Sequence, residues 1–368
     1  MMAEYDSTRR RFIRSSAAIG AGAWMMGVGR GQERAVLPEP DPVTPEAQQV
    51  IDRGLRFLGQ ECQGRDGSYS DTRTGFGNVA ITGLAGLALL AGGHQPGRGG
   101  YGDTVAKAAA WIVQRGERGQ PVGYLNNADA VLSHGGMYQH GFGALFLAEV
   151  LGMIPSPDLA VRVRNILEKA IDLTIRAQNR QGGWRYEPRP NQADVSVTVA
   201  QLMALRAARN AGLYVPKSVV DKCVEYIKAC QRPDGGFCYI LGQGFAGSAF
   251  ARSAAAIVGL FSAGEYEGRV IERGMQYLLQ FRPGARHPIR DVRPEHYFYG
   301  QYYAALAMWT AGGKYWEEWF PAIRDELVQK SRSAPRGIWY DYHGSAYATA
   351  MACIILQLPN NYLPIMQK

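Results

Sequence analysis

Three side chains of this sequence have the types needed for proton transfer: Asp194, His140 and His343. A carboxylic acid and an imidazole can exchange protons near neutral pH when a fold brings them together. For Asp194 the alternatives are capping the helix that starts at residues 195–198 and an ion pair with Arg252. For the histidines the alternative is hydrogen bonding within a polar lining. We predict Asp194, His140 and His343 as the catalytic residues.

Aromatic and basic side chains gather in the stretches around these three residues. The predicted substrate-binding set is Tyr138, Arg252, His296, Tyr299, Tyr302 and Tyr347. Tyrosine faces can stack on a sugar ring or stabilise a carbocation. The alternative for the tyrosines of residues 297–303 is packing within their own repeat.

A metal site is a further possibility for part of this set. His134, His140, Asp194 and His343 have the ligand types that zinc prefers. His134 and His140 stand six residues apart, which does not place them on one face of a helix. We expect no bound cofactor, and zinc is the alternative.

Repeated glycine turns indicate which elements carry these residues. Three segments align without gaps, beginning at Gln63, Gln178 and Gln231 and ending six residues later at Tyr69, Trp184 and Phe237. Two looser copies end at Tyr124 and Trp339. Each turn follows an amphipathic helical pattern and precedes a helical pattern rich in Ala and Gly, so the unit is helix, glycine turn, helix.

Six such units span most of the chain, at residues 47–95, 104–152, 161–213, 217–266, 268–313 and 317–358. The fifth lacks the turn signature, although its helical patterns at 270–281 and 302–310 remain. Small residues in each second helix allow close approach of helix axes, as an inner ring requires. We predict an all-α fold, an α6/α6 toroid of six helix-turn-helix repeats in two concentric rings.

The glycine turns resemble the repeats shared by squalene and oxidosqualene cyclases and by protein prenyltransferase β subunits. The resemblance covers residues 47–358 and implies that each turn Gln bridges helix ends while the aromatic packs beside it. It also implies an isoprenoid-like apolar ligand in the central cavity. The Asp-x-Asp-Asp motif of the cyclases does not occur in this sequence, and neither does the Gly-Cys-Gly-Glu-Gln of complement-like thioester toroids. The Asp-x-Cys of the zinc prenyltransferases, which a later His accompanies, occurs once, as Asp221-Lys222-Cys223 within the amphipathic helical pattern of the fourth unit.

The N-terminal residues are typical of an export signal. Arg9 and Arg10, with Phe12 two positions after the pair, precede the weakly apolar residues 17–24, as in a twin-arginine signal peptide. We predict a signal peptide at 1–35, a Pro-rich spacer at 36–46 and the toroid at 47–368. The protein is then bacterial and exported to the periplasm or cell envelope.

Composition excludes several classes of protein. The 368 residues include 45 Gly, with 46% hydrophobic and 20% charged residues, which is typical of a folded globular chain and not of a disordered one. Of the formal net charge of +8, residues 1–35 carry +3, and the remainder is too dispersed to indicate a nucleic acid partner. No apolar run is long enough to span a bilayer as a helix.

The five cysteines contain no CxxC pair. Cys230 could pair with Cys238 or with Cys223 in an oxidising compartment, although the spacing of Cys223 and Cys230 on one helix face is more typical of two buried apolar residues.

Three functions remain open from the sequence. The first is an exported squalene cyclase-like or prenyltransferase-like toroid that binds or converts an isoprenoid-like ligand. The second is a carbohydrate-active toroid such as a lyase, and the third is a non-catalytic interaction scaffold. Because the cyclase motif is absent and Asp-x-Cys occurs only within one amphipathic helical pattern, the sequence leaves open whether the protein is an enzyme.

Overall fold

The structure is a computed structural model that describes residues 42–127, 135–242, 247–285 and 296–367. Chain contacts separate residues 1–40 from a compact unit formed by residues 41–368, and the description below concerns the second unit. Its described residues form twelve α-helices and no β-strand beyond isolated bridges.

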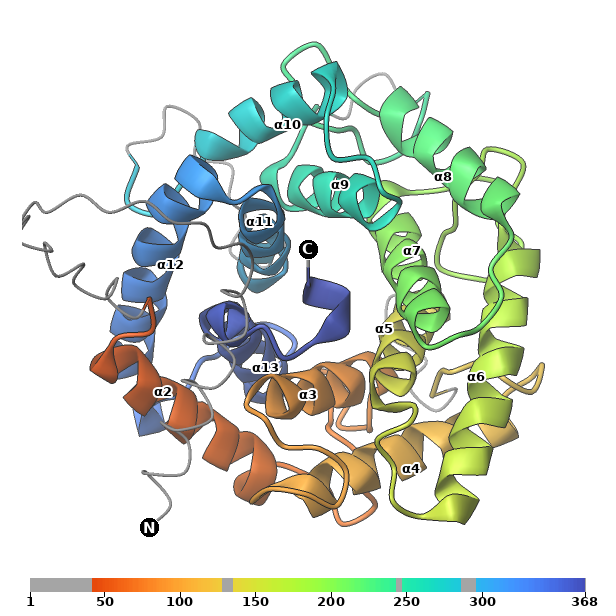
Figure 1. The fold of residues 1–368 in the computed structure, drawn as a ribbon, viewed down its shortest axis with the longest axis vertical. Helices are drawn as coiled ribbons and strands as arrows, with labels where there is room; N and C mark the ends of the chain where they lie inside the picture. Colours follow the sequence, from red (N-terminus) through yellow and green to blue (C-terminus); the bar gives the residue numbers. More distant parts are fainter. Residues whose placement is uncertain (1–41, 128–134, 243–246, 286–295, 368) are drawn as a thin grey trace, which may run out of the picture. The chain divides into compact units, whose positions relative to one another are not determined.

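The helices alternate between an outer and an inner ring (Figure 1). The outer helices are α2 (Pro45–Arg56), α4 (Gly102–Arg118), α6 (Pro157–Ala177), α8 (Lys217–Ala229), α10 (Arg269–Leu279) and α12 (Gly313–Ser333). The inner helices are α3 (Val79–Ala91), α5 (Gly136–Val150), α7 (Val195–Asn210), α9 (Phe250–Ser262), α11 (Tyr297–Ala311) and α13 (Ser345–Leu356). Each inner helix packs on the next, and α13 packs on α3. The predicted α6/α6 toroid is confirmed.

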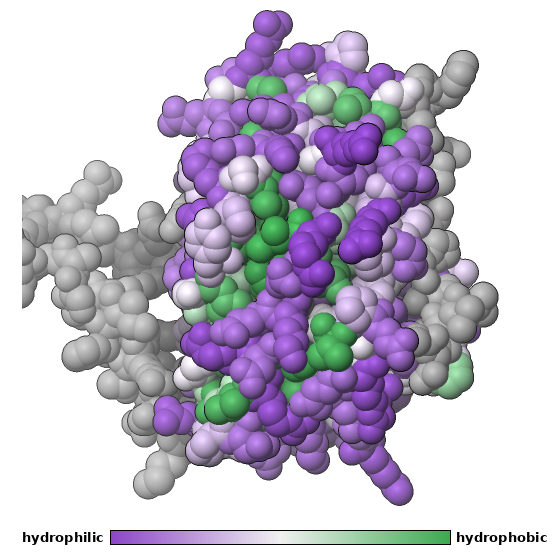
Figure 2. All heavy atoms as spheres, turned by 90° about the vertical axis from the view of Figure 1, so that its right-hand side faces the viewer, coloured by the Kyte–Doolittle hydropathy of each residue, from purple (hydrophilic) through white to green (hydrophobic). Residues whose placement is uncertain are grey.

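Side-chain size decides which helices can form the inner ring. Inner helices are buried almost all round, whereas outer helices bury one face only. Gly83 of α3 lies where a Cβ atom would come within 2.8 Å of the carbonyl oxygen of Phe142 on α5. A larger residue there would push the two axes apart. Figure 2 shows that the outer face on the α6 side is largely hydrophilic, with smaller hydrophobic areas between polar side chains.

The repeat turns fasten each outer helix to the next one. The Gln178 amide donates to Gly182 O and to Val219 O in α8, both at 2.8 Å. Gln63 and Gln231 make the equivalent pairs of bonds, to α4 and α10. The bridging role implied by the family resemblance is therefore confirmed for these three turns. The fifth turn region, residues 286–295, lies outside the described residues.

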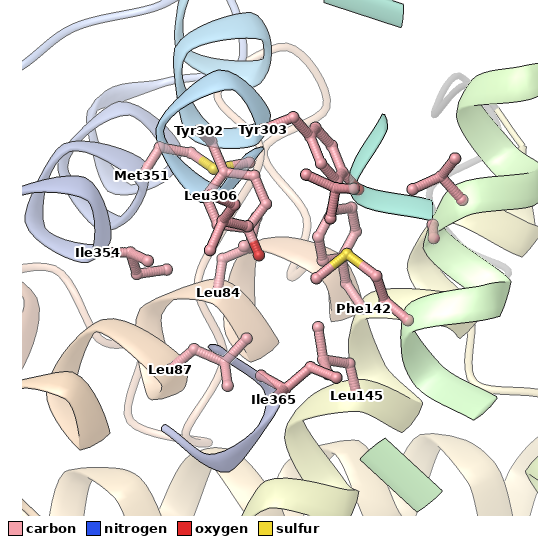
Figure 3. Packing of buried hydrophobic residues seen from close by; sticks show 14 of the residues in the cluster. Leu84, Leu87, Phe142, Leu145, Tyr302, Tyr303, Leu306, Met351, Ile354 and Ile365 are labelled. Carbon is pink, nitrogen blue, oxygen red and sulfur yellow. The ribbon is translucent and has the colours of Figure 1, made fainter. Parts of the chain in front are cut away.

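A C-terminal segment that the repeat pattern did not predict closes one end of the ring. The short 3-10 helices η4 (Leu358–Asn360) and η5 (Pro364–Met366) follow α13, and the chain ends at the centre of Figure 1. The indole of Trp309 donates to Met366 O at 2.8 Å. Figure 3 shows Ile365 among Leu87, Leu145 and other apolar side chains of the inner helices. The ring axis is therefore filled at the end where the inner helices finish.

Candidate active site at the start of the inner helices

Three tyrosines from three inner helices lie together near the opposite end of the axis. Tyr138 comes from α5, Tyr299 from α11 and Tyr347 from α13. Desolvation raises the pKa of all three phenols, and Tyr299 interacts electrostatically with both of the others. Yet all three side chains remain partly accessible to solvent. Each phenol is thus deeply placed but still reached by solvent, and we call this group of three side chains the tyrosine recess.

Asp194 lies at the edge of this recess as the N-cap of α7. Its Oδ1 accepts a hydrogen bond from Val197 N at 2.9 Å, and the side chain is completely buried. Oδ2 has no hydrogen-bond partner among the described residues. The capping alternative from the sequence is thus confirmed, and it leaves one oxygen available.

Burial decides the protonation of Asp194. Desolvation raises its pKa to about 7, although the capping bond from Val197, the charge of Arg185 and the nearby Tyr239 hydroxyl act in the opposite direction. Asp194 also interacts electrostatically with Tyr138 and Tyr299. The carboxyl is therefore a neutral acid, able to donate a proton, over part of the physiological pH range.

Two further tyrosines beside Asp194 were not predicted from the sequence. The hydroxyls of Tyr186 and Tyr239 form a short hydrogen bond with each other, and Tyr239 O accepts a bond from Val195 N at 3.0 Å. The rings of Tyr186 and Tyr138 lie 6.3 Å apart. Tyr186 and Tyr239 each stand two residues after the aromatic of a repeat turn, and Asp71 and Asp341 stand at the same position in other repeats. This periodicity could have identified them.

His343 lies on the other side of Tyr347, in a polar group that joins the first repeat to the last. Its ring centroid is 5.1 Å from that of Tyr347, and its Nδ1 is 3.8 Å from Oδ2 of the buried Asp71. Burial alone would raise the pKa of Asp71, but the interactions with His343 and Arg73 hold it well below its usual range. Asp71 therefore remains ionised behind the imidazole.

His140 is not brought to this group. It is completely buried, Nδ1 accepts from Leu125 N at 3.1 Å, and Nε2 contacts Ala170 O and Thr174 Oγ1 of α6. Desolvation lowers its pKa to about 4, so the imidazole is neutral. With both nitrogens bound to neighbouring elements, His140 has the alternative role, hydrogen bonding within the structure.

The remaining predicted ligand-binding residues are dispersed. Arg252 Nε donates to Phe237 O at 3.0 Å and Nη2 donates to Gly247 O, so the guanidinium holds a loop. His296 is exposed, and it lies close enough to interact electrostatically with Asp341, whose pKa burial raises. Tyr302 is fully buried in the axial packing shown in Figure 3, and its hydroxyl has no partner among the described residues.

The residues proposed as zinc ligands do not form a described metal site. His134 lies outside the described residues, and His140, Asp194 and His343 have the separate surroundings given above. Within the described ranges, no group of three or more His, Cys, Asp or Glu residues has the arrangement needed to hold a metal ion. In the same ranges, the helices are too short or too polar to cross a membrane.

Comparison with known families confirms the resemblance of the repeats. Residues 146–287 match the family model of the squalene-hopene cyclase C-terminal domain. The matched stretch includes Asp194, Tyr186 and Tyr239, but neither Tyr138 nor His343. No match was found among curated proteins.

Solved structures share the fold at low sequence identity. The type II terpene cyclase MstE from Scytonema, in complex with geranylgeranyl dihydroxybenzoate as substrate, superposes with a TM-score of 0.58 at 14% identity, covering 89% of this chain and 100% of that chain. The α-1,6-mannanase GH76A from Salegentibacter sp. HEL1_6 gives a TM-score of 0.62 at 7% identity, covering 86% and 99%. Cellobiose 2-epimerase from Bacillus thermoamylovorans B4167 gives 0.61 at 12% identity, covering 86% and 98%. The chain is thus an α/α toroid, a fold found in terpene cyclases and in sugar-converting enzymes.

Proposed function

We propose that this protein is an enzyme that binds an isoprenoid-like ligand in the tyrosine recess and transfers a proton to it from Asp194. The observation that carries the proposal is a completely buried carboxyl with one unpaired oxygen and a pKa raised to about 7, beside an aromatic recess. The match to the squalene-hopene cyclase domain over residues 146–287 supports the ligand class.

The raised pKa indicates which atom receives the proton. Protonation of an unactivated alkene needs a carboxylic acid strengthened by neighbours, whereas burial makes Asp194 a weaker acid. An acid with a pKa near the ambient pH is suited to general acid catalysis at an oxygen atom. We therefore propose an oxygen-bearing isoprenoid, such as an epoxide or an allylic alcohol, as the ligand.

The neighbouring residues have complementary roles in this mechanism. As the C–O bond breaks, the faces of Tyr138, Tyr299 and Tyr347 stabilise the positive charge that develops on carbon. His343, with the ionised Asp71 behind it, accepts a proton from an adjacent carbon, and an alkene forms. His343 then releases its proton to solvent and Asp194 regains one from solvent, so that no proton is gained or lost by the protein overall.

The experiment compares ligands and one isosteric variant. Asp194→Asn keeps an N-cap side chain but removes the acid. Thermal shifts of the full chain with oxidosqualene, geranylgeraniol, squalene and mannotriose would report binding, and gas chromatography with mass spectrometry would report conversion. We expect the oxygenated isoprenoids to raise Tm in both proteins and Asp194→Asn to lose at least about 100-fold in conversion.

Two outcomes would contradict the isoprenoid proposal and favour another function. Stabilisation by mannotriose alone would establish the carbohydrate-active alternative, which the tyrosine rings and the mannanase and epimerase folds also support. Stabilisation by none of the four ligands would favour the interaction scaffold, in line with the apolar filling of the other end of the axis.

We further propose export through the twin-arginine pathway, from the Arg9-Arg10 pair and the weakly apolar residues that follow. Replacing both arginines by lysine should retain the protein in the cytoplasm of a bacterial host. Immunoblots of periplasmic and cytoplasmic fractions test this, and unchanged fractionation would refute it.

A further inference from the structure

Two buried cysteines lie opposite each other at the base of the fourth repeat turn. Cys230 ends α8, Cys238 follows the turn aromatic Phe237, and both side chains are nearly inaccessible. The structure has both as free thiols. Neither residue has a part in the proposed proton transfer.

Backbone hydrogen bonds set the distance between them. Gln231 and Phe237 form an antiparallel bridge, flanked by bonds from Cys238 N to Cys230 O at 3.0 Å and from Arg232 N to Gly236 O at 2.8 Å. Cys230, the helical C-cap residue of α8, and Cys238 are the next pair along these segments, and their thiol groups interact with each other. Residues paired across antiparallel segments have Cα atoms about 4.5–5.5 Å apart, which lies inside the range that a disulfide requires.

Other repeats lack this pair. In the first repeat, the positions of Cys230 and Cys238 are occupied by Cys62 and Ser70, and in the third by Ala177 and Arg185. The repeat turn itself therefore does not require cysteines at these positions. Cys62, which is half-buried and has a serine at the position equivalent to Cys238, serves as an internal control.

The segments that carry the two cysteines also contact the residues next to Asp194. Tyr226, one helical turn before Cys230, donates to Ala193 O at 2.7 Å. Tyr239, the residue after Cys238, accepts from Val195 N at 3.0 Å. The residues on both sides of Asp194 are thus held by the two segments that carry the cysteines.

We propose that Cys230 and Cys238 form a disulfide that clamps the fourth repeat turn and so fixes the position of Asp194. The bond is independent of the proposed function, and only its effect on catalysis would depend on that function.

Glutathione disulfide can serve as the oxidant. One cysteine thiolate attacks it and releases one glutathione thiolate, and the second cysteine thiolate then attacks the mixed disulfide and releases another. Two protons leave the protein, and two electrons pass to glutathione. Burial raises the pKa of the Cys230 thiol to about 12, so the reaction belongs to folding, before the thiols are enclosed.

The test refolds the full chain in glutathione disulfide or in dithiothreitol, alkylates it under denaturing conditions and measures intact mass and peptide maps. We expect two fewer alkylated cysteines after oxidation, with 230 and 238 in one linked peptide. The oxidised protein should also melt about 5 °C higher than the reduced one.

Cysteine variants distinguish the effect of the proposed disulfide on Tm from effects of the other thiols. Cys238→Ser, which introduces the residue found in the first repeat, should abolish the redox dependence of Tm, and Cys62→Ser should retain it. Cys230→Ala provides a second test if Cys238→Ser fails to fold. Full alkylation after oxidation, or a linked peptide containing Cys223, would overturn the proposal, whether or not any ligand binds.

Discussion

The two oxygens of Asp194 have different surroundings, because one caps α7 and the other is buried without a hydrogen-bond partner among the described residues. A raised carboxyl pKa means that the folded protein binds this proton more tightly than the unfolded chain does. The resulting stability is fully present below the unfolded pKa of about 4 and is lost as pH rises through about 7.

The first prediction follows from this dependence of stability on pH. Because Asp194→Asn cannot ionise, its free energy of unfolding should exceed that of the parent by about 3 kcal/mol at pH 8 and nearly equal it at pH 4. Urea unfolding at both pH values measures the difference. Burial also raises the pKa of Glu149 to about 7. Glu149→Gln therefore provides a matched comparison of stability at the two pH values. An equal effect of Asp194→Asn at pH 4 and pH 8 would contradict the raised pKa.

The second prediction concerns buried tyrosine hydroxyls. The hydroxyl of Tyr302 has no partner among the described residues, whereas that of Tyr226 donates to Ala193 O. Tyr302→Phe should therefore change the free energy of unfolding by less than about 0.5 kcal/mol or increase it, and Tyr226→Phe should lower it by about 1–2 kcal/mol. The same denaturation assay distinguishes them, and a larger loss in Tyr302→Phe would indicate a bound water or ligand at its hydroxyl.

The sequence predicted the three tyrosines of the recess, but it did not predict all of the residues around them. Tyr138, Tyr299 and Tyr347 were predicted because they start inner helices, and the structure brings them together. His140 lies in the same stretch of sequence but points to α6, because helix rotation and not position along the chain decides which face a side chain occupies. Tyr186 and Tyr239 were missed because loops, not helices, carry them.

At the scale of elements, the repeat turn acts as the joint between successive outer helices. Its Gln satisfies one carbonyl in its own turn and one in the next outer helix. This explains why the repeat could be recognised from the sequence: the spacing from Gln to the aromatic is set by hydrogen-bond geometry. The C-terminal segment has no such repeat, so its place in the axis could not be predicted.

The third prediction tests this joint. Gln178→Ala leaves two carbonyl oxygens without their donor and should lower the free energy of unfolding by about 2–3 kcal/mol. Gln49→Ala, on the exposed face of α2, should change it by less than about 0.5 kcal/mol. Circular dichroism melts of both variants provide the comparison, and equal melting temperatures would refute the bridging role.

At the scale of the whole toroid, the C-terminal segment completes the core from inside the ring. Ile365 is buried against side chains of the inner helices, and its backbone N–H donates to Glu149 Oε2 at 3.4 Å. One short segment thus contacts helices that are far apart along the chain.

The fourth prediction is that Ile365→Ala destabilises the toroid by about 2–4 kcal/mol, since it opens a cavity where several inner helices meet. The neighbouring Gln367 is exposed, and Gln367→Ala should have little effect. Differential scanning calorimetry measures both. If Ile365→Ala melts with the parent, the segment does not contribute to the core.

Closure of the ring has a consequence for biosynthesis. The first inner helix, α3, packs on the last inner helix, α13, and residues 363–366 of the C-terminal segment follow both in the chain. A chain that emerges from the ribosome with its N-terminus first can form successive hairpins, but it exposes the apolar flank of α3 until the final helix is released. The nascent chain therefore carries an open seam until α13 is released, and we expect it to be prone to aggregation over that interval.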